Sequence, residues 1–319
     1  MTDRPRAENR ERNQPMPGSQ DFTPDPRNDA VLALLDGQLV PAREAQVSLF
    51  DAGFGLGDGV WEGLRLHRGA LLFLEAHLDR LYQGAAALRI DIGMTRAELT
   101  ASLRELLRAN GMEDGAHLRL MVTRGRKATI NQDPRFTTGR STIAVTAEFK
   151  RRPAAARPLA LAMSSIRTSP PEIFDMHLNT HSRLNYIRAL LDVMDTGADE
   201  AIMLDHRGFV ASCNATNLFW VKDGTVFTSR DHFCFNGITR GNVIALCRDG
   251  AAPLRQGDWE AEHLLAADEV FVTGTMGGVT PAGSINDHAL PASPGPVTTA
   301  IAQAYERLKD AYAEEHAIV

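Results

Sequence analysis

The chain has 319 residues, with 34 Lys and Arg against 40 Asp and Glu for a net charge of -6, and 44% of its residues are hydrophobic. This length supports two domains with a cleft between them. A mildly acidic chain without a basic run excludes nucleic acid as a partner, and no apolar stretch reaches the roughly 20 residues of a membrane span. Three cysteines without CxxC spacing argue against a disulfide framework or a structural zinc site. A charged start with no apolar leader indicates a cytoplasmic protein.

The first 28 residues contain almost nothing apolar to bury, which predicts a disordered arm. Asp36-Gly37 between two apolar segments predicts a hairpin, because both residues tolerate the positive φ of a type I′ turn. Thr95 with Glu98 three residues later forms a capping box, which predicts the start of a helix. The other elements expected in a first domain of residues 29–148 are a helix from Leu74 to Leu88 and strands at His117 to Thr123 and Ser141 to Ala147.

Residues 149–158 contain two prolines and four basic residues and show no periodicity, which predicts an interdomain linker. The second domain then covers residues 159–319. Its expected elements are a strand at Leu159 to Met163, a helix from Leu184 to Asp195, a second Asp-Gly hairpin at Asp223-Gly224, and helices near Gly241 to Arg248 and Thr298 to Tyr312. The predicted fold class is α/β (α+β) in two domains, with the site in the cleft between them.

A glycine cluster at residues 53–59 invites a dinucleotide-binding interpretation, but no register of it gives GxGxxG, so a Rossmann site is excluded. The cluster continues into Val60-Trp61-Glu62-Gly63 and is followed by His77-Leu78-Asp79-Arg80-Leu81. Later blocks are Val122-Thr123-Arg124-Gly125, Asn217-Leu218-Phe219-Trp220, Asn236-Gly237-Ile238-Thr239-Arg240, Thr273-Gly274-Thr275 and Val279-Thr280-Pro281. In this order and spacing the blocks resemble the fold-type IV pyridoxal-phosphate enzymes. These are the class IV aminotransferases, which include D-amino-acid and branched-chain aminotransferases, with the related aminodeoxychorismate lyase.

The resemblance implies a cup for the cofactor phosphate, or for another anion, at four residues of this chain. They are Arg80, Ile238 and Thr239 at a helix start, and Thr275 in the late Gly-Thr block. Backbone N–H groups at a helix N-terminus together with one guanidinium suit a dianion.

Two departures from the family pattern affect the chemistry. The family anchors its cofactor aldehyde with a lysine, and the spacing places Asn179 at that position. An amide nitrogen conjugated with a carbonyl forms no Schiff base and shuttles no α-proton. The family also sets a carboxylate against the pyridine nitrogen, five residues before the asparagine of Asn217-Leu218-Phe219, where this chain has Ser212. A serine hydroxyl lacks the charge that keeps the ring protonated.

Other residues of the same segments could supply chemistry. His181, Cys213, Asn179 and Ser212 are the candidate catalytic residues, with Cys213 as a thiolate paired with His181 or, alternatively, as a packing residue. His177 and His181 have i, i+4 spacing, but no third ligand accompanies them, so no metal site is expected. The candidate substrate-binding residues are Trp61, Arg126, Lys127, Arg183, Met276 and Gly277.

Three functions remain open at this point. The first is an enzyme that has lost lysine-linked pyridoxal chemistry and converts a small anionic metabolite, a carboxylate or a phosphate, without a cofactor. The second is an aminotransferase or lyase that holds pyridoxal or pyridoxamine phosphate noncovalently. The third is a noncatalytic metabolite-binding pseudoenzyme. The resemblance implies a homodimer in each case, and neither nucleic acid nor a membrane is an expected partner.

Overall fold

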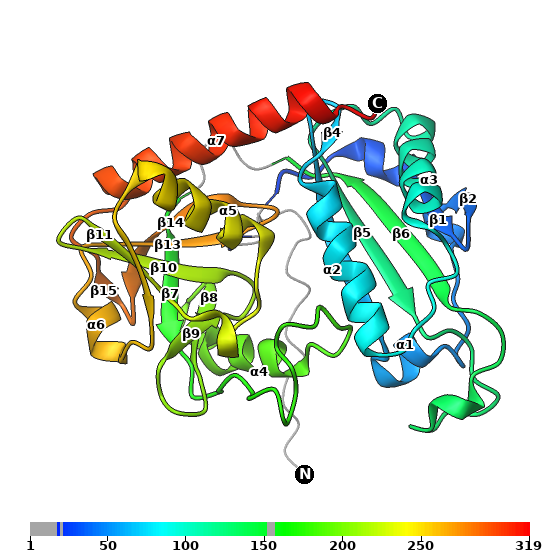
Figure 1. The fold of residues 1–319 in the computed structure, drawn as a ribbon, viewed down its shortest axis with the longest axis horizontal. Coiled ribbons are helices and arrows are strands. Elements are labelled where there is room, and N and C mark those ends of the chain that lie inside the picture. The colour runs from blue at the N-terminus through cyan, green and yellow to red at the C-terminus, as the bar shows by residue number, and fades with distance from the viewer. Residues whose placement is uncertain (1–17, 20–21, 152–156) are drawn as a thin grey trace, which may run out of the picture.

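The structure, a computed structural model, describes residues 18–19, 22–151 and 157–319. Most of the predicted arm and the linker residues 152–156 lie outside the described residues. We use "first half" for residues 22–151 and "second half" for residues 157–319, which lie on the right and left of Figure 1. No helix in these ranges is long and apolar enough to cross a membrane.

Residues 22–28 correct the expectation that the arm is disordered up to residue 28. A 3-10 helix at Pro26–Ala30 begins with Asp25 as its N-cap. The side chain of Asn28 forms two hydrogen bonds to the backbone of Phe149, at 3.0 and 2.7 Å. The order therefore comes from polar side chains that pair with a distant strand, a signal that the apolar pattern of the sequence does not carry.

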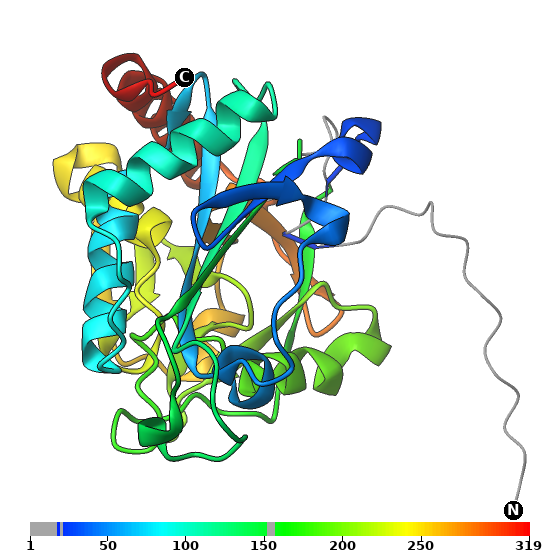
Figure 2. The same ribbon diagram turned by 90° about the vertical axis from the view of Figure 1, so that its right-hand side faces the viewer.

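The first half contains a six-stranded sheet in the order β2-β1-β6-β5-β3-β4. All neighbouring strands in this sheet are antiparallel. Asp36 and Gly37 both have positive φ, which confirms the predicted hairpin. The predicted capping box at Thr95 and Glu98 is also confirmed. Helix α2 packs on β3 and α3 on β1 (Figure 2). The elements are β1 (Leu32–Leu35), β2 (Gln38–Pro41), α1 (Ala52–Leu56), β3 (Gly59–His67), β4 (Ala70–Leu71), α2 (Leu74–Ala87), α3 (Arg96–Ala109), β5 (Ala116–Thr123) and β6 (Thr142–Phe149).

The second half is a nine-stranded mixed sheet in the order β12-β11-β10-β13-β14-β7-β8-β9, with β15 paired to β14. The Asp223-Gly224 hairpin joins β10 to β11 as predicted. The strands are β7 (Leu159–Met163), β8 (Glu200–Leu204), β9 (Val210–Cys213), β10 (Asn217–Lys222), β11 (Thr225–Ser229), β12 (Leu254–Gly257), β13 (Glu269–Gly274), β14 (Gly278–Ile285) and β15 (His288–Ala289). The helices are α4 (Leu184–Val193), α5 (Ile238–Leu246), α6 (Ala261–Leu265) and α7 (Pro296–His316).

Helix α7 runs along the top of both halves (Figure 1). Its first part packs on β13, β14 and α5 of the second half. Its last turns reach the first half, where the hydroxyl of Tyr312 accepts a hydrogen bond from the Leu74 N–H at 3.1 Å. Ile318 and Val319 then pack against the core of the first half. The C-terminal end of the chain therefore contributes to both halves, whereas the sequence predicts it as part of the second domain alone.

Candidate functional site

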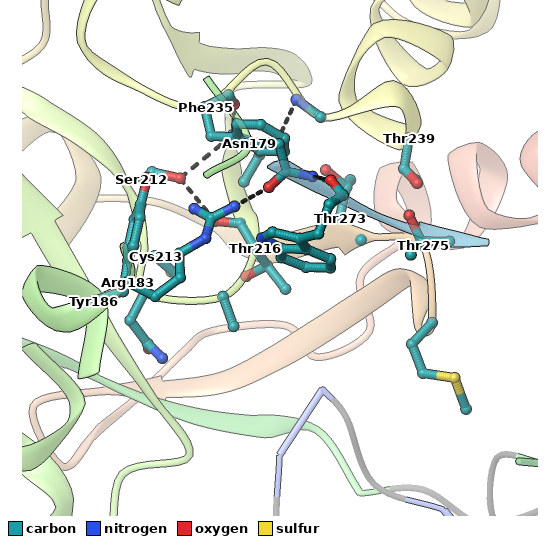
Figure 3. Close-up of a pocket in the computed structure, with 18 of the residues that line it drawn as sticks. Asn179, Arg183, Tyr186, Ser212, Cys213, Thr216, Phe235, Thr239, Thr273 and Thr275 are labelled. Carbon is teal, nitrogen blue, oxygen red and sulfur yellow. Dashed lines mark hydrogen bonds between the residues drawn. The ribbon is translucent and has the colours of Figure 1, made fainter. Parts of the chain in front are cut away.

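A cavity of about 560 Å³ lies between the two halves, within the range of small-molecule sites. Figure 3 shows part of its lining. Strand β3 and helix α2 contribute Trp61, Gly63 and Arg80, and β5 contributes His117 and Arg119. The second half contributes Asn179, Arg183, Tyr186, Ile187, Leu190, Leu191, Met194, Ser212, Cys213, Asn214, Ala215, Thr216, Asn217, Phe235, Gly237, Ile238, Thr239, Thr273, Gly274, Thr275 and Met276. The described lining contains three arginines but neither a carboxylate nor a lysine.

One end of the cavity is the start of α5. No side chain caps this helix, so its first N–H groups are free of side-chain acceptors. Gly237 allows the Asn217 side chain to pack against the start of α5, because a Cβ at residue 237 would lie 2.3 Å from Oδ1 of Asn217. Thr239 and Thr275 lie together at this end, facing each other in Figure 3. The structure thus brings three of the four predicted anion-binding residues, Ile238, Thr239 and Thr275, to one helix N-terminus, which is a favourable site for a phosphate.

Arg80, the fourth predicted anion-binding residue, extends from α2 to the same end and is held by a buried carboxylate. Its Nε and Nη2 donate to the two oxygens of Glu62 at 2.7 and 2.6 Å, and its Nη1 donates to the carbonyl of Asn236 at 2.7 Å. Burial is the largest influence on Glu62 and opposes its ionisation, but the hydrogen bonds and charge of Arg80, together with the hydrogen bond from His77, outweigh it and lower the pKa of Glu62. A guanidinium has five N–H donors, so Arg80 keeps two for a ligand.

His77 completes this buried group. Its Nδ1 lies 2.7 Å from the second oxygen of Glu62. Burial lowers the pKa of His77, so the imidazole is neutral at pH 7. The carboxylate therefore balances the charge of Arg80 alone. Glu62 and His77 are not among the site residues expected from the sequence, although they lie within the Val60–Gly63 and His77–Leu81 blocks.

Asn179 lies where the segment before α4 runs alongside β3. Its backbone carbonyl accepts from the Trp61 N–H at 2.9 Å, and its side-chain Nδ2 donates to the Trp61 carbonyl at 2.5 Å. Its Oδ1 accepts a hydrogen bond from Nη2 of Arg183. The amide is thus bonded at both ends to neighbouring protein groups, and the side chain is buried.

Arg183 places its guanidinium in the middle of the cavity among aromatic rings (Figure 3). It lies 5.2 Å from the ring centre of Trp61, 5.0 Å from that of Tyr186 and 5.4 Å from that of Phe235. Arg119 reaches Trp61 from β5, with its guanidinium 3.7 Å from the ring centre. Burial lowers the pKa of both guanidinium groups, and the charge of Arg183 lowers that of Arg119 further. Neither has a carboxylate as hydrogen-bond partner in the described part of the chain.

Ser212 and Cys213 line the opposite wall, at the end of β9. The Ser212 hydroxyl donates to the carbonyl of Thr216 at 2.7 Å and accepts from Nδ2 of Asn217 at 3.3 Å. Cys213 is buried, and burial raises its thiol pKa well above the ordinary value. A neutral thiol is a poor nucleophile.

Four other predicted site residues, His181, Arg126, Lys127 and Gly277, do not line the cavity. His181 hydrogen-bonds through Nε2 to the Val60 carbonyl at 3.2 Å and does not meet Cys213, and burial lowers its pKa. Lys127 is buried, with its Nζ donating to the Asp133 carbonyl at 2.8 Å, and neither Lys127 nor Arg126 lines the pocket. Met276 does line it, whereas the adjacent Gly277 does not. His177 contacts the Asp231 carbonyl, and the described residues contain no group of three or more His, Cys, Asp or Glu that could hold a metal ion.

Several lining residues were missed at the sequence level. Tyr186 lies in the helix expected from Leu184 to Asp195, Phe235 directly precedes the Asn236-Gly237-Ile238 block, and His117 and Arg119 lie on β5, where half-buried residues alternate with fully buried ones. That alternation, with His117 and Arg119 on the same face of the strand, was the available signal. Burial together with the charge of Lys150 lowers the pKa of His117 to about 3. Burial also raises the pKa of Tyr186 to about 12.

Comparison with known proteins agrees with this architecture. The family model "Amino-transferase class IV" matches residues 59–285. Branched-chain-amino-acid aminotransferase-like protein 2 of Arabidopsis thaliana is 37% identical over 290 residues, which are 90% of this chain and 52% of that protein. The chain thus spans about half the length of this relative. A putative branched-chain-amino-acid aminotransferase of Methanocaldococcus jannaschii is 34% identical and is covered to 88%, with 80% of this chain aligned.

A solved structure supports the same conclusion. The T.th. branched-chain amino acid aminotransferase with pyridoxamine 5′-phosphate superposes with a TM-score of 0.82 at 28% identity, covering 90% of this chain and 96% of that one. The mixed α/β architecture is therefore that of the fold-type IV aminotransferases. The chain belongs to the class IV aminotransferase family.

Proposed function

We propose that this aminotransferase-like chain binds a small anionic metabolite in the cavity between its halves, without a lysine-linked pyridoxal cofactor. The observation that carries the proposal is the lining itself, with three arginines and neither a carboxylate nor a lysine among the described residues. The chain has only four lysines, and none of them lines the cavity. Lys127 donates to the Asp133 carbonyl, and Lys150 lies over the ring of Phe22. Arginines keep their charge at neutral pH, so the cavity attracts anions.

The residues present fit one part of pyridoxal phosphate and not the rest. The uncapped start of α5 with Thr239, Thr275 and Arg80 suits a phosphate group. Asn179 cannot bond covalently to an aldehyde, and Ser212 directs its only proton to the Thr216 carbonyl rather than to a ring nitrogen. The cavity therefore does not fit the lysine-linked, ring-protonated cofactor.

Ligand binding is better supported than cofactor-independent conversion. A general acid or base needs a pKa near the working pH. The raised pKa of Cys213, the value of about 12 for Tyr186 and the value of about 3 for His117 leave these lining groups in one protonation state at pH 7. Asn179 and Ser212 do not titrate, and His181 lies outside the cavity. The third sequence-level hypothesis, a metabolite-binding protein without turnover, thus agrees best with the lining.

A second candidate function is noncovalent binding of pyridoxamine or pyridoxal phosphate. The phosphate end favours it, and the similar T.th. aminotransferase was crystallised with pyridoxamine 5′-phosphate. When bound, such a cofactor supplies an amine or aldehyde for amino-group exchange. Arg80, the start of α5 and Thr275 would hold the phosphate of the cofactor, and Trp61 and Phe235 would lie beside the rest of the cofactor.

We also propose a cytoplasmic homodimer, as the family resemblance implies. Helix α4 offers a surface for the contact, because Leu184, Ile187 and Leu191 are exposed to 68, 54 and 58%, and Met194, directly after the helix, to 51%. The last three of these residues also line the cavity, so this surface continues into the site. Large exposed apolar patches mark interaction sites.

The test is an absorbance spectrum of the purified chain with pyridoxal phosphate, followed by borohydride reduction, peptide mapping and intact mass. We expect no stoichiometric lysine adduct, and any bound chromophore should be displaced by inorganic phosphate. The double variant Asn179→Lys with Ser212→Glu is the matched control, in which a trapped adduct at residue 179 should appear. A stoichiometric adduct in the unmodified chain would disprove the proposal.

A further inference from the structure

The cationic groups of the cavity fall into two sets that differ in their counter-charges. Arg80, at the start of α5, is paired with Glu62 through two hydrogen bonds. Arg119 and Arg183, in the middle of the cavity, contact aromatic rings and one amide oxygen but no described carboxylate. In the described part of the chain, the positive charge that no carboxylate contacts directly is therefore at the second set, although the charge of Glu62 still acts on Arg183 from a distance.

A purely structural role does not account for Arg183. A structural arginine in a protein interior has its N–H groups hydrogen-bonded. The Nε of Arg183 is buried without a hydrogen-bond partner among the described residues, and the acceptor at its Nη2 is the Asn179 amide. Two like charges that are partly removed from water cost free energy unless an anion lies between or beside them. This position is therefore suited to a negatively charged ligand group.

The two ends are close enough for one molecule. Both guanidinium groups lie near the ring of Phe235, with Arg80 4.4 Å and Arg183 5.4 Å from its centre. The two guanidinium carbons are thus no farther apart than the sum of these distances. A chain of a few carbon atoms can place one charged group at each end.

We propose that the cavity is built for one short-chain phosphorylated carboxylic acid, with its phosphate at the start of α5 and its carboxylate against Arg183. This inference rests on the proposed function and adds the ligand class. A tetrahedral dianion suits the free N–H groups and hydroxyls of the helix end. A planar carboxylate suits a guanidinium, which can offer two parallel N–H groups. Arg119, which contacts the same Trp61 ring, adds its positive charge.

Two pairs of matched probes test the inference by isothermal titration of the full chain. In each pair a carboxylate replaces a hydroxymethyl group while the phosphate stays: 3-phosphoglycerate against glycerol 3-phosphate, and 6-phosphogluconate against sorbitol 6-phosphate. We expect the carboxylate to tighten binding about tenfold or more for at least one pair, the magnitude of a charge-assisted hydrogen bond. Equal Kd values within both pairs would overturn the inference while leaving the anion-binding function intact.

Variants of α4 and its N-cap identify the group responsible. Arg183→Met should abolish the preference for the carboxylate and leave the Kd of glycerol 3-phosphate within about twofold. That retained affinity also shows that the variant is folded. Arg183→Lys, which keeps the charge, should retain part of the preference. Arg188→Met removes an exposed arginine from the same helix and should change neither Kd.

The outcomes separate the two proposals. If Arg183→Met weakens both members of a pair equally, Arg183 does not read the carboxylate and the inference is wrong. If none of the four probes binds, both this inference and the anion-binding function fail. If the phosphate compounds bind without discrimination, only the inference fails.

Discussion

Glu200 is a fully buried carboxyl group on β8, directly behind the wall of the cavity. It accepts hydrogen bonds from the hydroxyls of Ser19 and Thr216, the latter at 2.5 Å. Burial raises its pKa from 4.5 to about 7, and the nearby charge of Asp199 adds to the effect. The folded chain therefore holds a proton that the unfolded chain has already released above pH 4.5.

This carboxyl group predicts a falling stability with rising pH. The contribution of Glu200 to the free energy of unfolding is fully present below pH 4.5 and is lost as the pH rises to about 7. Between these values the free energy of unfolding falls by about 1.4 kcal/mol per pH unit. Glu200→Gln, which mimics the protonated form, should remove about 3 kcal/mol of this loss between pH 4.5 and 7.5. Urea unfolding at several pH values measures this pH dependence of the free energy of unfolding, with the exposed Glu148→Gln as control. An unchanged slope in Glu200→Gln would show that another group titrates.

Gly237 is a second residue with a specific steric role. A Cβ at this position would lie 2.3 Å from Oδ1 of Asn217, whose Nδ2 holds the Phe235 carbonyl at 2.6 Å. Gly237→Ala should therefore displace the start of α5 and weaken the binding of inorganic phosphate by about tenfold or more. Gly241→Ala in the same helix is the control, because its Cβ meets nothing within 4 Å. That variant should bind phosphate normally and gain about 0.5–1 kcal/mol of stability. Equal phosphate affinity in both variants would refute the steric argument.

At the scale of elements, the start of α7 depends on a buried carboxylate from β13. Glu269 accepts hydrogen bonds from the backbone N–H groups of Val297 and Thr298, at 3.1 and 2.7 Å. Gly295 makes room for it, since a Cβ there would lie 2.1 Å from Cδ of Glu269. Glu269→Gln should lower the free energy of unfolding by about 1–2 kcal/mol, because one oxygen and the favourable charge at the helix start are lost.

Chemical denaturation followed by circular dichroism measures the effect of Glu269→Gln. Glu306→Gln, in the exposed middle of the same helix, removes only a surface ion pair with Lys309 and should cost less than about 1 kcal/mol. A loss of the same size in both variants would mean that Glu269 does not act as the cap.

The elements that sequence predicts correctly are those with local signals. The two Asp-Gly hairpins and the capping box at Thr95 each depend on residues within four positions of one another. The short helix at Pro26–Ala30 was missed because its stabilising partner, Phe149, lies far along the chain. The site divides in the same way. The residues at the start of α5 belong to one motif, and Arg183 was also named from the sequence as a candidate substrate-binding residue. Arg119 was not, because it comes close to Arg183 only where the two halves pack together.

At the scale of the whole molecule, α7 joins the two halves. Its Tyr312 hydroxyl accepts from the Leu74 N–H at the start of α2, and its Asp310 carboxylate lies 2.7 Å from His67 of β3. The earlier part of the same helix packs in the second half through Ile301 and Tyr305. A helix with contacts in both cores makes their unfolding cooperative.

Tyr312→Phe tests this coupling with little change in volume. Loss of the acceptor leaves the Leu74 N–H unpaired, which should cost about 1 kcal/mol. In a Trp61→Phe background, tryptophan fluorescence reports Trp220 and Trp259 of the second half, whereas far-UV circular dichroism reports both halves. We expect the two signals to give one shared transition, shifted to lower temperature in the variant. Separate transitions would show that the halves unfold independently.

The arrangement of charge has a kinetic consequence. The chain as a whole carries a net charge of -6, yet its cavity is lined by three arginines and no described carboxylate. An approaching anion is repelled at long range and attracted only within the cleft. Dissolved salt screens exposed charges beyond about 8 Å at physiological strength and acts less on groups at close range. Adding moderate salt should therefore speed the encounter while it weakens the final complex, so that kon and affinity respond to ionic strength in opposite directions.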